Sequence, residues 1–297
     1  MDKNDPQLRD AIHEVVVRYY ERGERDEIVL EGTDQVFMDG GAAQIPAMLL
    51  SPVPHDEDFQ ILRAFTDPEA VILDIGANAG YSVASIWAVG SKCKIVSFEV
   101  LPWHFAALDA IAQLRPGNYG FRMLGLSDTR GSMKFVVPVV NGFTVSALSS
   151  ASTTPNLDCL TKNIYDHTML WIPGTEITSV KFWEIDASVE VLDHLIKTDK
   201  NLLGNRSIAA MKLDIEGFEY RALMGARGVL KRHKPLVMVE GGNCWEGLAE
   251  YMATLGYFYA EKRGMTLVPA EGVCQGNNGF YVHHDKVESY RKIGIYQ

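Results

Sequence analysis

One short stretch of the chain combines residue types that suit the binding of a nucleoside, and it reads Asp74-Ile75-Gly76-Ala77-Asn78-Ala79-Gly80. The apolar run before it indicates a buried strand, because parallel strands covered on both faces show little polar alternation. The glycines allow a sharp turn, and a helix over Tyr81–Val89 would offer unpaired N–H groups to a ligand. This arrangement is typical of the first turn of a nucleotide-binding α/β sheet. Its candidate binding residues are Asp74, Gly76, Ala77, Asn78, Gly80 and Tyr81, and we call residues 74–81 the glycine turn.

Polar residues also follow the next two expected strands. Glu99 ends an apolar strand over 94–99 and lies 19 residues past Gly80, which suits a carboxylate that accepts hydrogen bonds from both ribose hydroxyls. Ser127 and Asp128 end a third strand over 120–126, where they are placed to meet an adenine. An ordinary Asp-containing turn before Gly131 is an equally good interpretation of that pair.

Three further acids, Asp214, Glu216 and Glu240, fall at the ends of two later apolar strands, over 208–213 and 235–239. The dipole of the helix that begins near residue 219 would by itself explain Glu219. It does not explain Asp214, which stands at the strand edge where open α/β sheets bind their ligands. We therefore expect the catalytic groups among these three carboxylates.

These motifs, in this order, resemble the FkbM family of methyltransferases over about residues 70–241. The segments that carry the resemblance are Asp74–Gly80, Ser97–Glu99, Leu126–Asp128 with Gly131, Leu192-Asp193, Met211–Glu219 and Val239-Glu240. The resemblance implies S-adenosyl-L-methionine as cofactor and a Rossmann-like Class I methyltransferase fold with a seven-stranded sheet. It also implies O-methylation of sugars or polyketide-type natural products. The sequence departs from the family in having Glu99-Val100 in place of an acid–proline pair, and in the stretch 141–180, which has no counterpart.

Methyl transfer from a sulfonium needs the acceptor oxygen in line with the methyl carbon, and a base helps to remove the hydroxyl proton. Asp214, Glu216 and Glu240 are the candidate bases, with His104 and His167 as less favoured ones. Asp214 could instead orient the amino group of the cofactor or the acceptor. A divalent metal on Asp214, Glu240 and Asn243 is an alternative that these oxygen ligands would suit, although we favour a site without metal.

The elements that must position these residues alternate between strand and helix across 70–282, which predicts an α/β fold with a mostly parallel sheet and helices on both faces. Helices are expected at 81–89, 102–114, 188–197, 219–230 and 245–255, with further strands at 132–140, 181–186, 257–260 and 279–282.

An amphipathic helix is expected to begin at Asp5-Pro6 and to end near Gly23, with an apolar stripe of Leu8, Ala11, Ile12, Val15, Val16 and Tyr19. We expect the stripe to pack on its own domain; a lid or homodimer contact is the alternative. Residues 1–60 are predicted to be a helical arm and wrapping segment, and 61–297 the methyltransferase domain. Its irregular insertion at 141–180 is predicted to face the substrate.

The composition of the chain restricts the kinds of partner that it is expected to bind. The net charge of -10 argues against nucleic acid, and the four scattered cysteines form no metal or redox motif. The absence of a signal core or long apolar run predicts a cytoplasmic protein without membrane contact and with a small-molecule or glycan acceptor. The rival interpretations are a nicotinamide oxidoreductase, whose glycine pattern is missing, a nucleic-acid methyltransferase, and a non-catalytic binding module of the same fold.

Overall fold

The computed structural model describes residues 6–21, 28–29, 49, 51, 53–149, 156–171, 179–272, 274 and 276–297. The chain divides into two compact units, of which the first comprises residues 1–40 and 133–187 and the second residues 41–132 and 188–297. The predicted domain boundary lies at residue 60, and the predicted insertion spans 141–180. The segment that joins the N-terminal residues in the first unit is therefore longer than the expected insertion.

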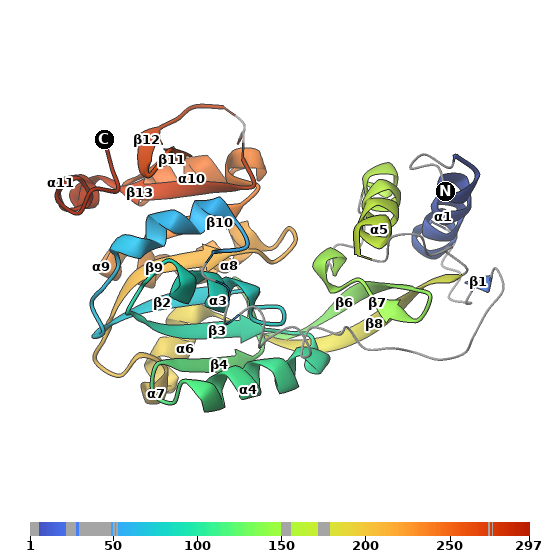
Figure 1. Cartoon of the computed structure of the whole chain (residues 1–297), viewed down its shortest axis with the longest axis horizontal. Helices are drawn as coiled ribbons and strands as arrows, with labels where there is room; N and C mark the ends of the chain where they lie inside the picture. Colours follow the sequence, from blue (N-terminus) through green and yellow to red (C-terminus); the bar gives the residue numbers. More distant parts are fainter. Residues whose placement is uncertain are drawn as a thin grey trace. The chain divides into compact units, whose positions relative to one another are not determined.

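The second unit is built on an eight-stranded sheet in the order β12-β11-β13-β10-β9-β2-β3-β4 (Figure 1). The strands from β10 to β4 pair in parallel, whereas β13, β11 and β12 pair antiparallel. The strands are β2 (Ala70–Ile75), β3 (Lys94–Glu99), β4 (Tyr119–Met123), β9 (Ser207–Leu213), β10 (Leu236–Glu240), β11 (Tyr257–Arg263), β12 (Thr266–Pro269) and β13 (Asn278–His283). The predicted α/β fold is confirmed, but the sheet has one strand more than the seven expected. The extra strand is β12, which turns back at Gly264 to pair with β11.

Alternate residues of the parallel strands pack into two different cores, one on each face of the sheet. Ile72 and Ile95 belong to one core, and Leu73 and Val96 belong to the other. The first core is covered by η1 (Glu57–Ala64), α3 (Tyr81–Ala88), α4 (Phe105–Leu114) and α11 (Val287–Lys292). The second is covered by α6 (Leu192–Thr198), α7 (Lys200–Leu203), α8 (Glu219–Gly225), α9 (Arg227–His233) and α10 (Leu248–Thr254). The helices on both faces are thus confirmed, and they explain why most residues of the central strands are apolar.

The first unit holds α1 (Pro6–Tyr20), β1 (Ile28–Val29), β7 (Phe143–Thr144), α5 (Leu157–Trp171) and most of β6 (Gly131–Val140) and β8 (Ser179–Glu190). Ile12, Val15 and Val16 of α1 are buried in one core with Ile164 of α5 and Val180 of β8. The apolar stripe of α1 therefore packs within its own unit, as we expected. The side chains of Leu8 and Tyr19 of the stripe, and the expected helix ends at Asp5 and Gly23, lie outside the described part of the chain.

Several elements differ from the sequence prediction. The segment 141–180 contains the helix α5, because Leu157, Leu160 and Ile164 recur at helical spacing. The strand expected over 120–126 is split into β4 and β5 (Gly125–Leu126), and β5 pairs with β8. The helix expected at 188 begins at Leu192, the helix over 219–230 breaks at Ala226, and the helix expected at 245 begins at Leu248.

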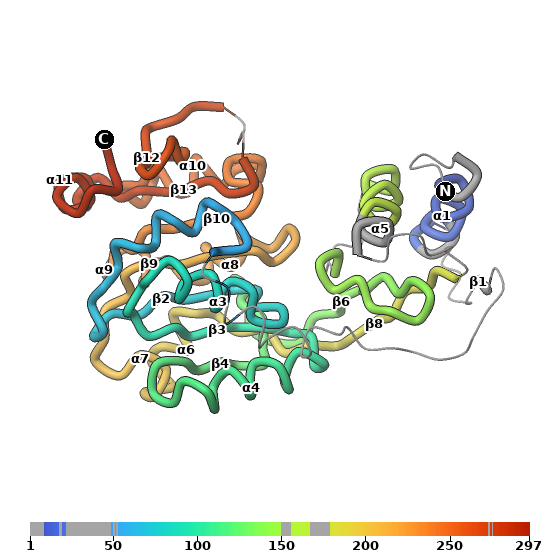
Figure 2. Tube along the Cα trace, viewed as in Figure 1, coloured from blue at the N-terminus to red at the C-terminus, as the bar shows by residue number. Residues whose placement is uncertain are grey.

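The parallel core of the sheet brings together strands that are distant in sequence. Figure 2 shows β2 between β3 and β9, although the segment 133–187 separates β9 from both of them in the chain. The carboxyl ends of β2, β3, β9 and β10 consequently meet at one edge, where the candidate residues lie. Within the described residues, no helix combines the length and the apolar character needed to cross a membrane.

Candidate functional site

The glycine turn is held tightly against its two neighbouring strands. The backbone N–H groups of Gly76 and Ala77 donate to the carbonyl of Phe98 at 3.0 and 3.1 Å, and that of Asp214 donates to the carbonyl of Ile75 at 3.0 Å. Gly76 has a φ of +86°, and a Cβ atom there would lie 1.8 Å from the carbonyl oxygen of Asp214. Gly76 is therefore required for the contact between the two turns as well as for the bend.

Glu99 is almost fully buried and accepts hydrogen bonds from backbone N–H groups of the glycine turn and of the two residues that follow β3. One carboxylate oxygen accepts from Asn78 at 2.7 Å, and the other accepts from Val100 and Leu101 at 2.7 and 2.8 Å. A carboxylate can accept about four hydrogen bonds, so the described residues leave one position for a ligand hydroxyl, and not the two that the predicted contact with both ribose hydroxyls needs. The ribose role of Glu99 stays a prediction, and the structure adds a second role, because Glu99 also fixes the backbone of the glycine turn.

Ser127 and Asp128, the predicted adenine-binding pair, contact each other and the helix α8. The Ser127 hydroxyl donates to Asp128 Oδ1 at 3.0 Å, and Arg221 Nε donates to the same oxygen at 2.8 Å. Gly225 packs so closely that a Cβ atom would lie 2.1 Å from the Ser127 carbonyl oxygen. The partnership with Arg221 had no signal in the sequence, since the two residues are separated by the whole segment 129–220. The adenine contact itself stays a prediction.

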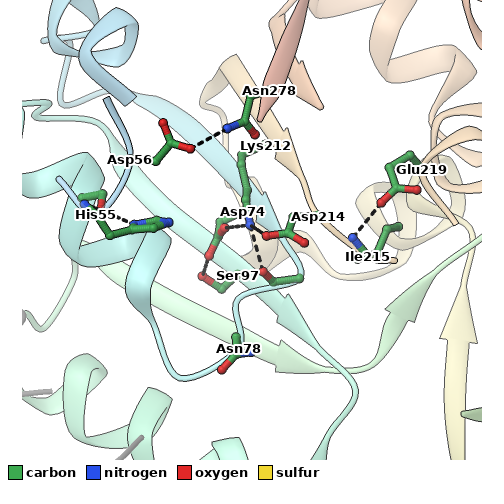
Figure 3. A network of polar contacts seen from close by, with 12 residues as sticks. His55, Asp56, Asp74, Asn78, Ser97, Lys212, Asp214, Ile215, Glu219 and Asn278 are labelled. Atoms are coloured by element: carbon green, nitrogen blue, oxygen red, sulfur yellow. Dashed lines mark hydrogen bonds and ion pairs between the residues drawn. The ribbon is translucent and has the colours of Figure 1, made fainter. Parts of the chain in front are cut away.

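A buried lysine, Lys212, lies between the glycine turn and the acids, as Figure 3 shows. Its ammonium group donates to the carbonyl of Gly76 at 3.1 Å and to Asp214 Oδ2 at 3.0 Å, and lies 3.9 Å from Asp74 Oδ1. The fully buried Asp74 also accepts from the hydroxyl of Ser97 at 2.8 Å. Burial by itself would lower the pKa of Lys212, but the carboxylates of Asp214 and Asp74 raise it on balance. Lys212 is part of the motif Met211–Glu219, but the sequence alone predicts no role for it.

Asp214, Glu216 and Glu240 come together as predicted, with one carboxyl oxygen of each lying within 4.8 Å of the others. Burial raises the pKa of Glu216 to about 8, with repulsion from Asp214 added. Burial and the hydrogen bond to Asp214 raise the pKa of Glu240 to about 9. Burial opposes the ionisation of Asp214, but the ammonium of Lys212 and the hydrogen bond with Glu240 together lower the pKa of Asp214. Near neutral pH the cluster therefore holds an ionised Asp214 flanked by two protonated glutamates.

Glu219 stabilises the turn that carries the acids. It is fully buried, and its two carboxylate oxygens accept from the backbone N–H groups of Ile215 and Gly217 at 2.8 and 2.9 Å. Between them Glu216 takes a left-handed backbone conformation with a φ of 52°, which is uncommon for a residue with a side chain. These specific hydrogen bonds give Glu219 a clearer structural role than the helix dipole considered for it.

Among the described side chains, the less favoured candidates His104 and Asn243 do not join the cluster. His104 is buried, which lowers its pKa to about 4. The side chain of His167 lies outside the described residues. The amide of Asn243 is engaged elsewhere, since it donates to the carbonyl of Gly272 at 2.8 Å and accepts from the hydroxyl of Tyr281 at 3.3 Å. Asn243 is thus a poor third ligand for a metal on Asp214 and Glu240.

Residues 53–64, most of which fall in the predicted arm and wrapping segment over 1–60, pack within the second unit near the glycine turn. The backbone N–H of His55 donates to the hydroxyl of Ser85 at 3.0 Å, and His55 Nδ1 lies 2.6 Å from the same oxygen. Burial and the charge of Lys212 lower the pKa of His55. Asp56 accepts from the side-chain amide of Asn278 at 3.1 Å. No local sequence pattern in this segment indicated these contacts.

Comparisons with known proteins agree with the motifs. A family model described as the methyltransferase FkbM domain matches residues 74–259. Similar solved structures include a methyltransferase FkbM from Methylobacillus flagellatus, at 12% identity and a TM-score of 0.43, over 93% of this chain and 58% of that one. An rRNA methylase from Streptococcus thermophilus is 12% identical with a TM-score of 0.36, over 77% of this chain and 93% of that one. A putative O-methyltransferase from Klebsiella pneumoniae is 11% identical with a TM-score of 0.37, over 92% of this chain and 96% of that one. The chain therefore spans 58% of the length of the first structure. A search of curated proteins gave no match.

Proposed function

The chain belongs to the FkbM methyltransferase family, and from this premise we propose that it transfers a methyl group from S-adenosyl-L-methionine to a hydroxyl oxygen of a sugar, a glycan or a polyketide-type natural product. The observation that carries the proposal is the carboxylate of Asp214. It pairs with the ammonium of Lys212 at 3.0 Å, its side chain is 37% exposed, and its backbone N–H binds the carbonyl of Ile75 beside the glycine turn. The strongly negative net charge supports a small or glycan acceptor over a nucleic acid.

The donor set at the strand ends suits S-adenosyl-L-methionine. The free acceptor position of Glu99 suits a ribose hydroxyl, and the half-exposed Asp214 suits a positively charged ammonium or sulfonium group. We propose that the glycine turn with Glu99, Ser127 and Asp128 binds the nucleoside. When bound, the cofactor supplies an electrophilic methyl group, and the protein has to provide orientation and a proton acceptor.

Asp214 is the proposed proton acceptor. The acceptor hydroxyl becomes strongly acidic as its oxygen gains a methyl group, so an ionised carboxylate of ordinary basicity can remove the proton. Glu216 and Glu240, protonated beside it, can donate hydrogen bonds to Asp214 or to the acceptor. Neither glutamate has to lose its proton for Asp214 to act.

A cation on the three clustered carboxyl groups is the second route that the geometry permits. We favour the route without metal, because the ammonium of Lys212 already compensates the charge of Asp214 at 3.0 Å. A chelator separates the routes. Loss of transfer that magnesium restores would support the metal, and unchanged transfer would support direct proton removal.

The cofactor assignment is tested by isothermal titration calorimetry with S-adenosylhomocysteine. Glu99→Ala should weaken binding by about 1–3 kcal/mol, the range for a lost hydrogen bond to a charged group. Glu288→Ala is the control, since Glu288 is an exposed residue of α11 and is not one of the proposed binding residues. Equal affinity of wild type and Glu99→Ala would remove Glu99 from the cofactor site.

The acceptor is identified by incubating the protein with cofactor carrying a labelled methyl group and with extracts of producer cells. Mass mapping of the labelled product then gives the methylated atom. Label on a hydroxyl oxygen of a sugar or polyketide supports the proposal. Label on nitrogen, carbon or nucleic acid would contradict it.

A further inference from the structure

Lys212 connects three groups that belong to two different turns. Its ammonium meets the Gly76 carbonyl and the Asp74 carboxylate from β2 and the glycine turn, and the Asp214 carboxylate from the turn after β9. An ammonium has three donors; the Gly76 carbonyl and Asp214 Oδ2 accept hydrogen bonds from it, and Asp74 Oδ1 lies 3.9 Å away as an ion-pair partner. The residue is only 4% exposed, so water offers it little alternative.

Burying this charge is costly unless it is paired, because each buried ion loses several kcal/mol of hydration. Asp74 is fully buried, and its Oδ1 atom has no hydrogen-bond partner within the described residues, so the charge of Lys212 is its nearest compensation. Asp214 is the partner that also reaches solvent. Lys212 thus compensates the charge of the buried Asp74 in β2 and, at the same time, that of Asp214 at the edge where the reaction is proposed to occur.

The two turns are also in direct contact. Asp214 N–H donates to Ile75, and the space at Gly76 is filled by the Asp214 carbonyl oxygen. Both turns present oxygen atoms to the gap between them, and these oxygens would repel one another without a cation. We propose that Lys212 is a positioning residue that holds the glycine turn and the Asp214 carboxylate in one fixed arrangement, so that cofactor affinity depends on the two together. This inference rests on the proposed function of the site.

A double-mutant cycle on cofactor affinity tests the coupling. The probe is S-adenosylhomocysteine, titrated into wild type, Lys212→Met, Asp214→Asn and the double variant. Lys212→Met should weaken binding about tenfold, and Asp214→Asn should then have a smaller effect than it has in wild type, since coupled sites deviate from additivity by a measurable energy. If the affinity of the double variant falls by the product of the two single-variant fold-changes, the two residues are not coupled, and the proposal is overturned.

Loss of stability has to be separated from loss of position. Lys212→Met leaves the buried Asp74 without its counter-charge, so we also use Asp74→Asn with Lys212→Met, which removes both charges. This variant should regain the melting temperature lost in Lys212→Met while its affinity stays low. Recovery of affinity together with stability would show a purely structural lysine and overturn the proposal.

Lys134→Met is the control, since Lys134 forms an exposed ion pair with Glu184 in the first unit and should leave affinity unchanged. A wild type that does not bind the probe would contradict the proposed function, and the coupling with it. A wild type that binds, with equal binding by Lys212→Met, would contradict only the coupling.

Discussion

At the scale of single residues, the site separates carboxyl groups of one chemical type into different roles. Glu219 and Glu99 are buried and accept backbone N–H groups, so they shape the two turns. Asp214 is held ionised by Lys212, whereas Glu216 and Glu240 keep their protons. The environment of each side chain, and not its type, decides which role it has.

Replacing Asp214 tests its proposed role as the proton acceptor. Asp214→Asn is nearly isosteric, so the fold should be retained while the proton acceptor is lost. We expect turnover to fall by about 10²–10⁴-fold, the usual effect of removing a general base. Turnover is measured with labelled cofactor once the acceptor is known, with circular dichroism to confirm folding. Unchanged turnover with a normal pH profile would make Glu240 the next candidate.

The raised pKa values of Glu216 and Glu240 predict how stability depends on pH. Both groups hold a proton in the folded protein at pH values where the unfolded chain has released it, so the folded state binds more protons. Stability must therefore fall as pH rises from about 5 through about 9. Urea unfolding at several pH values, in buffer with a chelator, should show this fall.

Glu240→Gln should make that fall shallower, because it removes one of the titrating groups. Glu288→Gln on the exposed helix α11 is the control and should keep the wild-type slope. The same slope in wild type and in Glu240→Gln would show that Glu240 does not hold its proton in the folded protein.

At the scale of elements, the apolar strands and their order of alternation with helices could be predicted, because a strand buried on both faces has a clear sequence pattern. The residues at the ends of those strands could be predicted for the same reason. The contacts between turns could not, since no local pattern says that Lys212 reaches Gly76 or that Arg221 reaches Asp128. The break after Met123 was missed because tertiary pairing with β8 decides it. The helix α5 did have a sequence signal in the helical spacing of Leu157, Leu160 and Ile164, and that signal was overlooked.

Gly76 and Gly90 provide a matched test of the contact between turns. Both have a left-handed backbone, with φ of +86° and +88°, but only Gly76 faces other atoms within 4 Å. Each change to alanine should cost about 1–3 kcal/mol through backbone strain. Gly76→Ala should in addition push Asp214 away, lose more stability in urea unfolding and abolish binding of S-adenosylhomocysteine. Equal losses in the two variants would show that the two turns can separate freely.

At the scale of the whole molecule, the chain has two compact units with separate cores. The residues of the proposed cofactor site all belong to the second unit. We propose that the first unit, with residues 141–180 and the N-terminal helix, serves the acceptor, as an addition to a unit that binds the cofactor by itself. If this is correct, damage to the first unit should reduce transfer and leave cofactor affinity intact.

Calorimetric unfolding tests this division of labour. Two separate units should give two transitions, and S-adenosylhomocysteine should raise only the transition of the unit that binds it, because a ligand stabilises the state to which it binds. Ile164→Ala in the core of the first unit and Ile61→Ala in the core that η1 covers in the second unit remove equally buried side chains, each at a cost of about 2–5 kcal/mol. Ile164→Ala should lower the transition that the ligand does not move and leave the affinity at its wild-type value. Ile61→Ala should lower the ligand-sensitive one. A single transition that both variants lower, and that the ligand raises as a whole, would show one cooperative molecule in which the first unit contributes to cofactor binding.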